Sequence, residues 1–434
     1  MEDHNQIFVA NGSRVYDVDD EVIARLEAAV TIGDDAVEGV LDSCGLLLPR
    51  LINDLPLTSP PLRAISLAIA QKCNLGCTYC YASQGDFGGP PKDMTSQTAE
   101  RAVRLLIDAA QPGDRVNVAF LGGEPMTNRT VLRATTEFAA AMAAAREVRI
   151  GFSITSNGTL LTADDADFFE QHGFAVTISL DGVREDHDRQ RPFKNGNGSF
   201  DRIIDRVRPL LARQRKMQVS VRTTILPGNV LLRHSLEFFL DLGFHSVGFS
   251  PVLRSPNGHG ELSATDLESF LDGMIECGLE FERRVLRGER YAFANIINAL
   301  REIHRGTHRP YPCGAGAGYL GVSADGELAA CHRFVGDSEG RMGDLSQGID
   351  RESQNVWLAE RHVHSQSPCG ECWARYLCAG GCHHEVIARG RPACDFIRGW
   401  LRYSLQAYDR LSRLRPEWFM ELPADRASTA IPRQ

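Results

Sequence analysis

Cysteines supply most of the residues in this chain whose chemistry could carry a function. There are 12 of them in 434 residues, and all but two fall into two groups. The first group is Cys73, Cys77 and Cys80, and the second is Cys313, Cys331, Cys369, Cys372, Cys378, Cys382 and Cys394. Disulfide scaffolds are usually short and secreted, with cysteines spread through the fold. A long chain with clustered cysteines instead indicates reduced thiolates that bind metal, and a cytoplasmic location. The isolated Cys44 and Cys277 are expected to be small buried side chains.

The first group lies in one short loop, Cys73-Asn74-Leu75-Gly76-Cys77-Thr78-Tyr79-Cys80. Three thiolates at this spacing can hold one cubic iron–sulfur cluster and leave one iron without a protein ligand. Such an open iron can chelate an amino acid through its amine and carboxylate. The alternative is zinc, but a structural zinc site needs four ligands and no fourth Cys or His is near in the sequence.

The second group holds seven thiols, which is more than one cluster can use. Two metal centres are therefore expected between residues 313 and 394. A pair of zinc ribbons is the alternative reading of the same spacing.

Composition narrows the class of protein further. Hydrophobic residues make up 43% of the chain and charged residues 24%, as in an ordinary soluble globular protein. The net charge of −9 lacks the basic surface from which nucleic-acid binders gain affinity. No apolar run approaches the roughly 20 residues of a membrane span, and the acidic N-terminus does not resemble a secretory signal. We therefore expect neither a nucleic-acid nor a membrane partner.

Alternating strand and helix patterns must position the first cysteine loop. Strands are expected at residues 63–70, 115–120, 148–155, 175–180, 218–224 and 246–249. Helices are expected at 96–110, 130–145, 162–172, 199–215 and 231–242, with two more at 265–286 and 292–304. This alternation predicts an α/β fold with a parallel sheet, closed only partly as a (β/α)6 TIM-like barrel. The loop follows the first strand, at the end where barrel enzymes place their chemistry.

The patterns divide the chain into segments 1–58, 59–304 and 305–434. In the first, Asn11-Gly12 predicts a hairpin with a type I′ turn, followed by two helices and a Pro-rich linker at 55–61. The last segment is Cys- and Gly-rich and poor in periodic pattern, so metal is expected to organise it. An amphipathic helix at 396–414 closes it.

The loop resembles the signature of the radical S-adenosylmethionine (SAM) enzymes, Cys-x3-Cys-x2-Cys with an aromatic residue before the third cysteine. The resemblance implies a SAM-binding 4Fe-4S cluster and a 5′-deoxyadenosyl radical that abstracts hydrogen from the substrate. It also implies cofactor contacts after successive strands: Tyr79, Gly122, Gly123, Glu124, Pro125, Ser156, Asn157, Ser179 and Arg191. Tyr79 would face the adenine, Glu124 the methionine ammonium, and Ser179 and Arg191 its carboxylate. Arg222 is a second cation for that carboxylate or, alternatively, part of a strand-end salt bridge.

The second cysteine group resembles the SPASM extension, which carries two auxiliary 4Fe-4S clusters. The resemblance assigns Cys369, Cys372, Cys378 and Cys394 to an outer cluster and Cys313, Cys331 and Cys382 to an inner one. Relatives whose inner cluster is fully ligated have a further cysteine where this chain has Tyr319. The inner cluster is thus expected to have an open iron that a substrate thiolate could bind, unless Cys277 or a carboxylate fills the position.

His332 distinguishes between subfamilies. Sulfatase-maturing relatives place an aspartate directly after the second cysteine of this segment, where His332 stands. The histidine is either a base or a donor to cluster sulfur, and we favour the donor. The stretch 312–344 instead resembles the enzymes that mature quinohemoprotein amine dehydrogenase and those that cross-link cysteine-rich peptides through thioethers.

These patterns predict an oxidoreductase-type radical SAM maturase that modifies a ribosomally made peptide or protein containing cysteine. Thioether or other cross-link formation is the favoured reaction. Carbon–carbon cyclisation, anaerobic sulfatase (formylglycine) maturation and a non-enzymatic electron-transfer module remain alternatives. An external low-potential electron donor is required by the favoured chemistry. The first segment resembles part of a leader-binding module, which adds a strand from the substrate to an exposed edge, or it is only a barrel cap.

Overall fold

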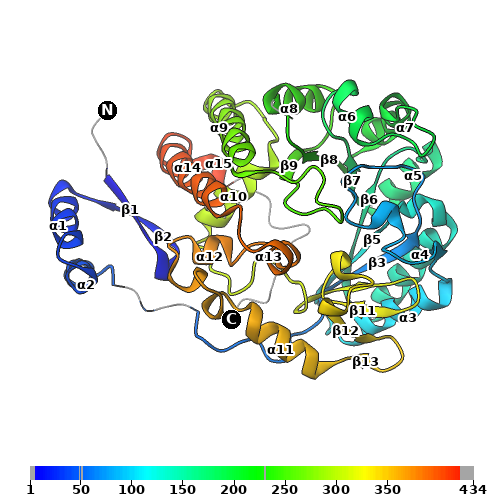
Figure 1. Ribbon diagram of the computed structural model, residues 1–434, viewed down its shortest axis with the longest axis horizontal. Helices are drawn as coiled ribbons and strands as arrows, with labels where there is room; N and C mark the ends of the chain where they lie inside the picture. Colours follow the sequence, from blue (N-terminus) through cyan, green and yellow to red (C-terminus); the bar gives the residue numbers. More distant parts are fainter. Residues whose placement is uncertain (1–4, 48, 50–51, 229–230, 421–434) are drawn as a thin grey trace.

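The computed structural model describes residues 5–47, 49, 52–228 and 231–420 of the chain (Figure 1). Residues 1–4 lie outside the described residues, as do residues 421–434 of the last segment. The first four belong to the acidic N-terminus, which does not resemble a secretory signal. Among the described helices, none combines the length and the apolar character needed to cross a membrane.

A parallel sheet forms the centre of the molecule and matches the predicted alternation. Its strands, in spatial order, are β3 (Ala64–Gln71), β5 (Arg115–Gly122), β6 (Arg149–Ser156), β7 (Ala175–Ser179), β8 (Gln218–Ile225) and β9 (Val247–Pro251). Each adjacent pair is parallel. All eight residues of β3 are buried, which explains its nearly continuous apolar sequence, since a central parallel strand is covered on both faces. The expected six-unit α/β partial barrel is confirmed.

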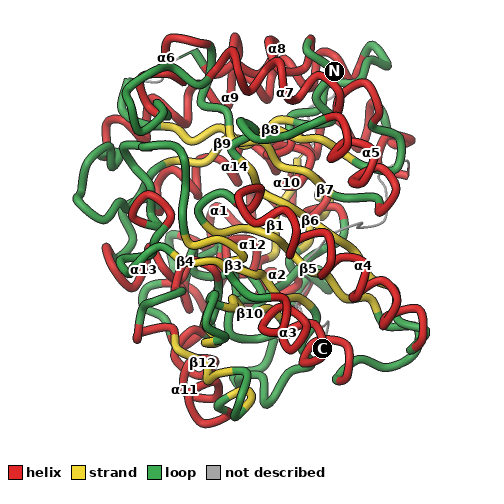
Figure 2. Tube along the Cα trace, turned by 90° about the vertical axis from the view of Figure 1, so that its right-hand side faces the viewer, coloured by secondary structure: helices red, strands yellow, loops and turns green. Residues whose placement is uncertain are grey.

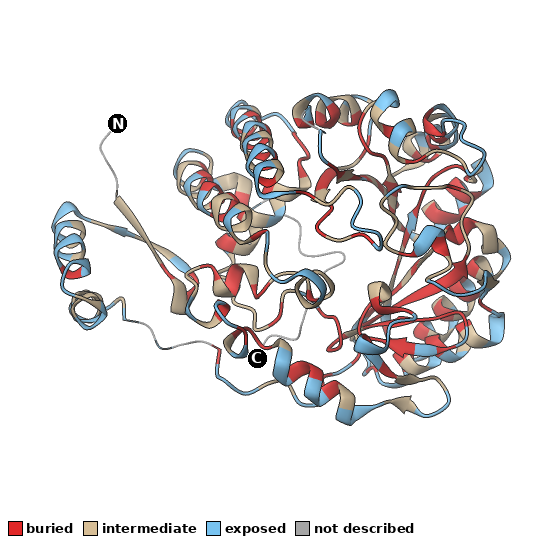
Figure 3. Cartoon of the chain, viewed as in Figure 1, coloured by how far each residue is buried: buried red, intermediate tan, exposed pale blue. Residues whose placement is uncertain are grey.

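Helices cover the outer face of this sheet. They are α3 (Ser96–Asp108), α4 (Arg129–Ala145), α5 (Ala163–His172), α6 (Arg184–Gln190), α7 (Phe200–Arg213) and α8 (Leu232–Asp241), followed by α9 (Ala264–Leu286) and α10 (Ala294–His304). Thr162 and Asp165 form a capping box at the start of α5, which satisfies backbone donors that a helix leaves unpaired. Figure 2 shows the strands inside and the helices outside, and Figure 3 shows that burial concentrates on the strands and the inward helix faces.

The last segment continues the barrel sheet, although its sequence is poor in periodic pattern. Its strands are β10 (Tyr319–Val322), β11 (Glu327–Ala329), β12 (Arg341–Asp344) and β13 (Gly348–Ile349). Strand β10 pairs in parallel with β3, and the buried Leu320, Val322 and Leu328 belong to the barrel core. These strands are too short for a clear alternation of apolar residues, so hydrophobic burial organises the segment more than its sequence suggests.

Helices complete the last segment. They are α11 (Arg351–Arg361), α12 (Arg375–Cys378), α13 (His383–Arg389), α14 (Cys394–Leu414) and α15 (Pro416–Met420). Helix α14, predicted from its amphipathic pattern, packs on α9 and α10, where Tyr403 and Arg410 both donate hydrogen bonds to the buried Glu282. The last segment therefore contacts the barrel in two ways, through the packing of α14 and through the pairing of β10.

The first segment is a hairpin with two helices that extends from the rest of the molecule (Figure 1). It consists of β1 (Asn5–Val9), β2 (Arg14–Val18), α1 (Asp20–Val30) and α2 (Asp34–Ser43). The hairpin was predicted correctly but its turn was not. A 3-10 turn over Ala10–Gly12 joins the strands, with Ser13 in the left-handed region, so four residues and not two separate the paired ends. Phe8 packs edge-on against Trp373, which ties the hairpin to the outer cysteines.

Candidate active site

The first cysteine loop lies directly after β3 and is held by the loop that follows α6. The amide of Gly76 donates to the carbonyl of Pro192 at 2.8 Å, and that of Thr78 to Gln190 at 3.1 Å. The Asn157 side chain donates to the Cys73 sulfur at 3.7 Å. The thiols of Cys73, Cys77 and Cys80 interact electrostatically with one another. The fold thus brings the three predicted ligands together at the carboxyl end of the sheet.

These three thiols are suited to bind metal as thiolates. Burial raises the pKa of the Cys77 thiol to about 11 and also raises that of Cys73 and Cys80. A thiol in such a place becomes a thiolate when metal supplies the compensating charge. Among the described residues, no group of three or more Cys, His, Asp or Glu side chains converges as a single-ion site would require. A cubic cluster needs no such convergence, because each thiolate binds a different iron.

The Gly-Gly-Glu-Pro turn after β5 lies against the backbone that leads into the first cysteine loop. A side chain at Gly122 would place its Cβ 2.4 Å from the Ala70 carbonyl oxygen, and one at Gly123 would approach Lys72 to 2.2 Å. Only glycine fits this close approach. Pro125 begins the short helix that follows. The turn therefore needs these residue types to sit beside Cys73.

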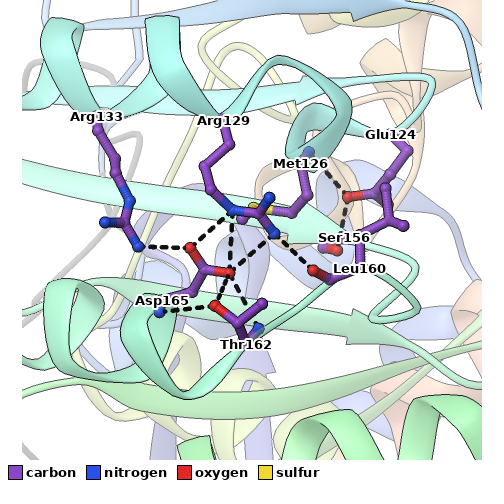
Figure 4. Close-up of polar contacts among 8 residues, drawn as sticks. All are labelled: Glu124, Met126, Arg129, Arg133, Ser156, Leu160, Thr162 and Asp165. Carbon is purple, nitrogen blue, oxygen red and sulfur yellow. Dashed lines mark hydrogen bonds and ion pairs between the residues drawn. The ribbon is translucent and has the colours of Figure 1, made fainter.

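Glu124 is wholly buried at the centre of this turn. Its carboxylate accepts hydrogen bonds from the amide of Asn157 at 2.7 Å, the Ser156 hydroxyl at 2.8 Å and the amide of Met126 at 3.0 Å. Glu124, Ser156 and Asn157, predicted from two separate strands, are thus brought together, and Figure 4 shows the contacts of Glu124 with Ser156 and Met126. Burial raises the pKa of Glu124 while these donors lower it.

A second carboxylate, that of Asp165, stabilises the turn after β6 that follows Ser156 and Asn157. Asp165 is buried and accepts from Arg129 at 3.0 Å and from Arg133 at 2.8 Å. Arg129 also donates to the Leu160 carbonyl at 2.6 Å (Figure 4). These contacts tie α4 and α5 to the turn after β6 and hold Ser156 and Asn157 in place.

Tyr79 and Arg191 meet at a residue that the sequence reasoning did not select. The Tyr79 hydroxyl donates to the carboxylate of Asp181, and the Arg191 guanidinium donates to the Tyr79 hydroxyl at 2.5 Å and lies 3.7 Å from Asp181. Asp181 is wholly buried and also accepts from the amide of Thr224 at 2.9 Å. The Arg191 Nε is buried and has no hydrogen-bond partner among the residues that the structure describes. Asp181 follows Ser179 by two positions at the end of a strand, and that signal could have identified it.

Two residues behind Asp181 fix this group. The amide of Asp181 donates to His187 Nδ1 at 3.2 Å, and His187 Nε2 lies 2.9 Å from the Ser199 hydroxyl. Ser199 in turn donates to the Arg191 carbonyl at 2.6 Å. Burial lowers the pKa of His187 to about 3, so the ring stays neutral and accepts the amide.

Ser179, the last residue of β7, is paired in register with Arg222 of β8. The Arg222 side chain is exposed. Its charge interacts with Arg333 and Glu385 of the last segment, whereas Arg191 is the cation beside Tyr79 and Glu124. Arg222 therefore faces the last segment, and its two alternative roles, a cation for the cofactor carboxylate or part of a strand-end salt bridge, stay predictions.

The electrostatic contacts described for the seven later cysteines link members of the same predicted set, while the assignment of each thiol to a cluster stays a prediction. Cys331 interacts electrostatically with Cys313 and Cys382. Cys378 interacts with Cys369 and Cys394, and Cys369 also with Cys372. A cavity beside α12 and α14 is lined by all four cysteines of the outer set and also by Cys382. Burial raises the pKa of the Cys331 thiol to about 12, which again suits a metal-bound thiolate.

Tyr319 does not join the inner set of thiols. Its hydroxyl donates to the Ser66 hydroxyl at 2.7 Å and lies 2.8 Å from His332 Nδ1. The His332 ring also packs edge-on against Tyr81, with centroids 5.7 Å apart. These contacts connect the first cysteine loop, β3 and the segment after Cys331 in one polar and aromatic group.

The two isolated cysteines differ from each other. Cys277 is wholly buried in α9, as expected, and interacts with Glu276, Arg233 and Glu237, not with the inner set. Cys44 is only partly buried, so the expectation for it was wrong. It caps α2 next to Ser43, with Arg25 at 4.0 Å, because this two-helix unit is too small to enclose it.

Comparison with known proteins agrees with the geometry. Residues 67–238 match the model of the Radical SAM superfamily. The chain is 26% identical over 376 residues to a serine-type anaerobic sulfatase-maturating enzyme of Klebsiella aerogenes, covering 83% of this chain and 88% of that protein. This alignment extends far beyond the matched domain.

Two solved structures share the fold. A structure of native anSMEcpe with bound AdoMet and the Kp18Cys peptide aligns with a TM-score of 0.68 at 19% identity, covering 82% of this chain and 99% of that one. Streptococcus suis SuiB bound to the precursor peptide SuiA aligns with a TM-score of 0.55 at 13% identity, covering 85% and 84%. The expected radical SAM domain, with its cluster and SAM, is confirmed. The role of each individual residue stays a prediction.

Proposed function

We propose that this radical SAM enzyme modifies a peptide or protein substrate and forms a thioether or another cross-link in it. The single observation that supports a peptide or protein substrate is the alignment with a sulfatase-maturating enzyme over most of both chains. The fold of anSMEcpe and SuiB, both solved with peptides, is consistent with it. When bound, the cluster and SAM supply a radical able to remove hydrogen from an unactivated carbon.

The chain's own residues bind and orient the cofactor. Cys73, Cys77 and Cys80 hold the cluster, and the turn around Glu124 receives the methionine ammonium at its buried carboxylate. The unpartnered Nε of Arg191 is available for the methionine carboxylate, because a guanidinium binds a carboxylate through two donors. Tyr79 is held by Asp181 and Arg191 and provides an aromatic surface for the adenine.

Cross-linking is favoured by the inner set of cysteines. Cys331 interacts with Cys313 and Cys382, and Cys313 with Cys382, while Tyr319, at the position where relatives have a further cysteine, is engaged with Ser66 and His332. An iron in a cluster held by three thiolates keeps one position for a thiolate of the substrate. If Cys313, Cys331 and Cys382 hold such a cluster, its open iron would supply a binding position for a substrate cysteine, whose sulfur would become one end of the new bond.

Formylglycine formation in a sulfatase is the second candidate, favoured by the similarity of the chain to the Klebsiella aerogenes sulfatase-maturating enzyme. It is weakened by His332, whose ring is held between Tyr319 and Tyr81 at the position where the sulfatase-maturing family has an aspartate. We place His332 as a donor near the inner set, not as a base.

The first segment is proposed to guide the substrate. In the described residues, β1 and β2 form a sheet of two strands, so each keeps one unpaired edge. A leader segment could add a strand there. An external low-potential electron donor completes the proposed system.

Mass spectrometry separates the two reactions. Anaerobic turnover with a cysteine-containing precursor peptide encoded near this gene should remove two hydrogens and leave one cysteine resistant to alkylation. A product that reacts with a hydrazide probe would instead establish an aldehyde, as formylglycine maturation requires. A chain that contains its clusters but cleaves no SAM with any peptide would contradict both.

A further inference from the structure

Arg333 connects the two cysteine regions of the molecule. It lies in the short helix His332–Phe334, directly after Cys331. Its guanidinium lies 5.4 Å from the ring centroid of Tyr81, the residue after Cys80. Its Nη1 donates to the Cys382 sulfur at 3.5 Å. One cation therefore contacts a cysteine of the inner set and a neighbour of the first cysteine loop.

The orientation of Arg333 is well determined. The same Nη1 donates to Glu385 at 2.7 Å, and the side chains of Arg333 and Glu385 are only 20% and 17% exposed. The planar guanidinium is also positioned by the face of Tyr81, a favourable cation–π contact. Because three groups hold it, Arg333 presents a fixed charge to Cys382.

We infer that Arg333 is a positioning residue that sets the reduction potential of the inner cluster, and that the negative charge of Glu385 partly offsets its effect. This inference rests on the proposed function, which assigns Cys313, Cys331 and Cys382 to that cluster. A hydrogen bond from a cation to a ligating sulfur stabilises negative charge, and reduction adds one negative charge. Arg333 therefore favours the reduced form, and the carboxylate of Glu385 opposes it. The electron taken up is the one that closing the cross-link releases from the substrate.

The test is a redox titration of the full-length, anaerobically reconstituted protein, followed by electron paramagnetic resonance. The inner cluster is identified as the signal that Cys331→Ala removes. Arg333→Gln should lower the reduction potential of the inner cluster by about 59 mV, which corresponds to a tenfold change in the one-electron equilibrium. Arg333→Lys should retain most of the wild-type potential. Glu385→Gln should shift the same signal in the opposite direction. Arg233→Gln, which removes an equal charge beside Glu237 and Glu280, is the matched control.

The opposite shifts distinguish tuning from a merely structural role, which would change cluster content and leave the potential unmoved. If Arg333→Gln does not retain the cluster, Glu385→Gln decides, because it leaves Arg333 in place. The inference would be overturned if the wild type held three clusters and no variant shifted the inner-cluster potential more than Arg233→Gln does. That result would leave the proposed function intact. A wild type without an inner-cluster signal would overturn the proposed function and the inference with it.

Discussion

The hydroxyl of Tyr79 donates a hydrogen bond to the buried carboxylate of Asp181, and this contact connects the first cysteine loop with the end of β7. Arg191 donates to the same hydroxyl, so the carboxylate orders both the aromatic ring and the guanidinium that are proposed to contact SAM. Asp181, which was not among the predicted site residues, thus orders Tyr79 and Arg191, which were.

Replacing Asp181 should weaken SAM binding without loss of the cluster. In Asp181→Asn, the amide presents donors where Tyr79 and Arg191 also donate, and the ordering of both is lost. We expect SAM to bind about tenfold more weakly, or about 1.4 kcal/mol, by anaerobic equilibrium titration at unchanged iron content. The control Asp186→Asn removes a carboxylate paired with Arg189 on the surface of α6 and should bind SAM as the wild type does. Equal affinities in both variants would contradict the role of Asp181.

Glu124 should matter for folding as well as for the cofactor. Glu124→Gln places an amide donor against the donors of Ser156, Asn157 and Met126, at a wholly buried site. We expect a loss of about 1 to 3 kcal/mol in the free energy of unfolding, measured with denaturant in the cluster-free protein. Glu137→Gln on the exposed side of α4 should change it by less than about 0.5 kcal/mol. An unchanged stability in Glu124→Gln would show that the donors find other partners.

Acid should destabilise the barrel through His187. Burial lowers its folded pKa to about 3 from the ordinary 6.5, so below pH 6.5 the unfolded chain binds a proton that the folded chain does not. This contribution to stability is present above pH 6.5 and is lost as the pH falls toward 3. One pH unit below 6.5, it amounts to about 1.4 kcal/mol. Denaturation at pH 7.5 and 5.5 should show a smaller loss in His187→Asn than in the wild type, and an equal loss would rule out this histidine.

The hairpin should protect the outer cysteines. Phe8 and Val15 pack with Trp373, Cys372 and Cys378 in one cluster, so Phe8→Ala should loosen the hairpin. Since Phe8 is only half-buried, we expect a cost of about 1 to 2 kcal/mol, below the value for a fully buried phenylalanine. Faster hydrogen exchange across residues 5–18 and 369–378 would report it. Ile32→Ala, at a residue that is 79% exposed, should leave exchange unchanged.

The barrel could be predicted because it depends on local signals, whereas the two sets of later cysteines were implied by the resemblance to the SPASM extension. The expected strands agree with β3 and β5–β9 to within two residues, since long buried strands and helices carry strong periodicity. Glu124, Ser156 and Asn157 follow successive parallel strands, whose carboxyl ends meet at one edge.

What could not be predicted depends on contacts between distant residues. Strand β10 is only four residues long, and its pairing with β3 is set by the folded barrel. The turn at Asn11-Gly12 took a longer loop than its dipeptide favours, because tertiary contacts such as that of Arg375 with Asn11 override local preference. The direction of Arg222 and the fixed position of Arg333 depend on the last segment, which no local pattern reveals.

Iron and acid-labile sulfide in the anaerobically reconstituted chain test the central claim most directly. Three 4Fe-4S clusters require about 12 irons per chain with an equal amount of sulfide, and the variant lacking Cys73, Cys77 and Cys80 should retain about 8. Fewer than about 8 irons in the wild type, or zinc in place of iron in the last segment, would contradict the account.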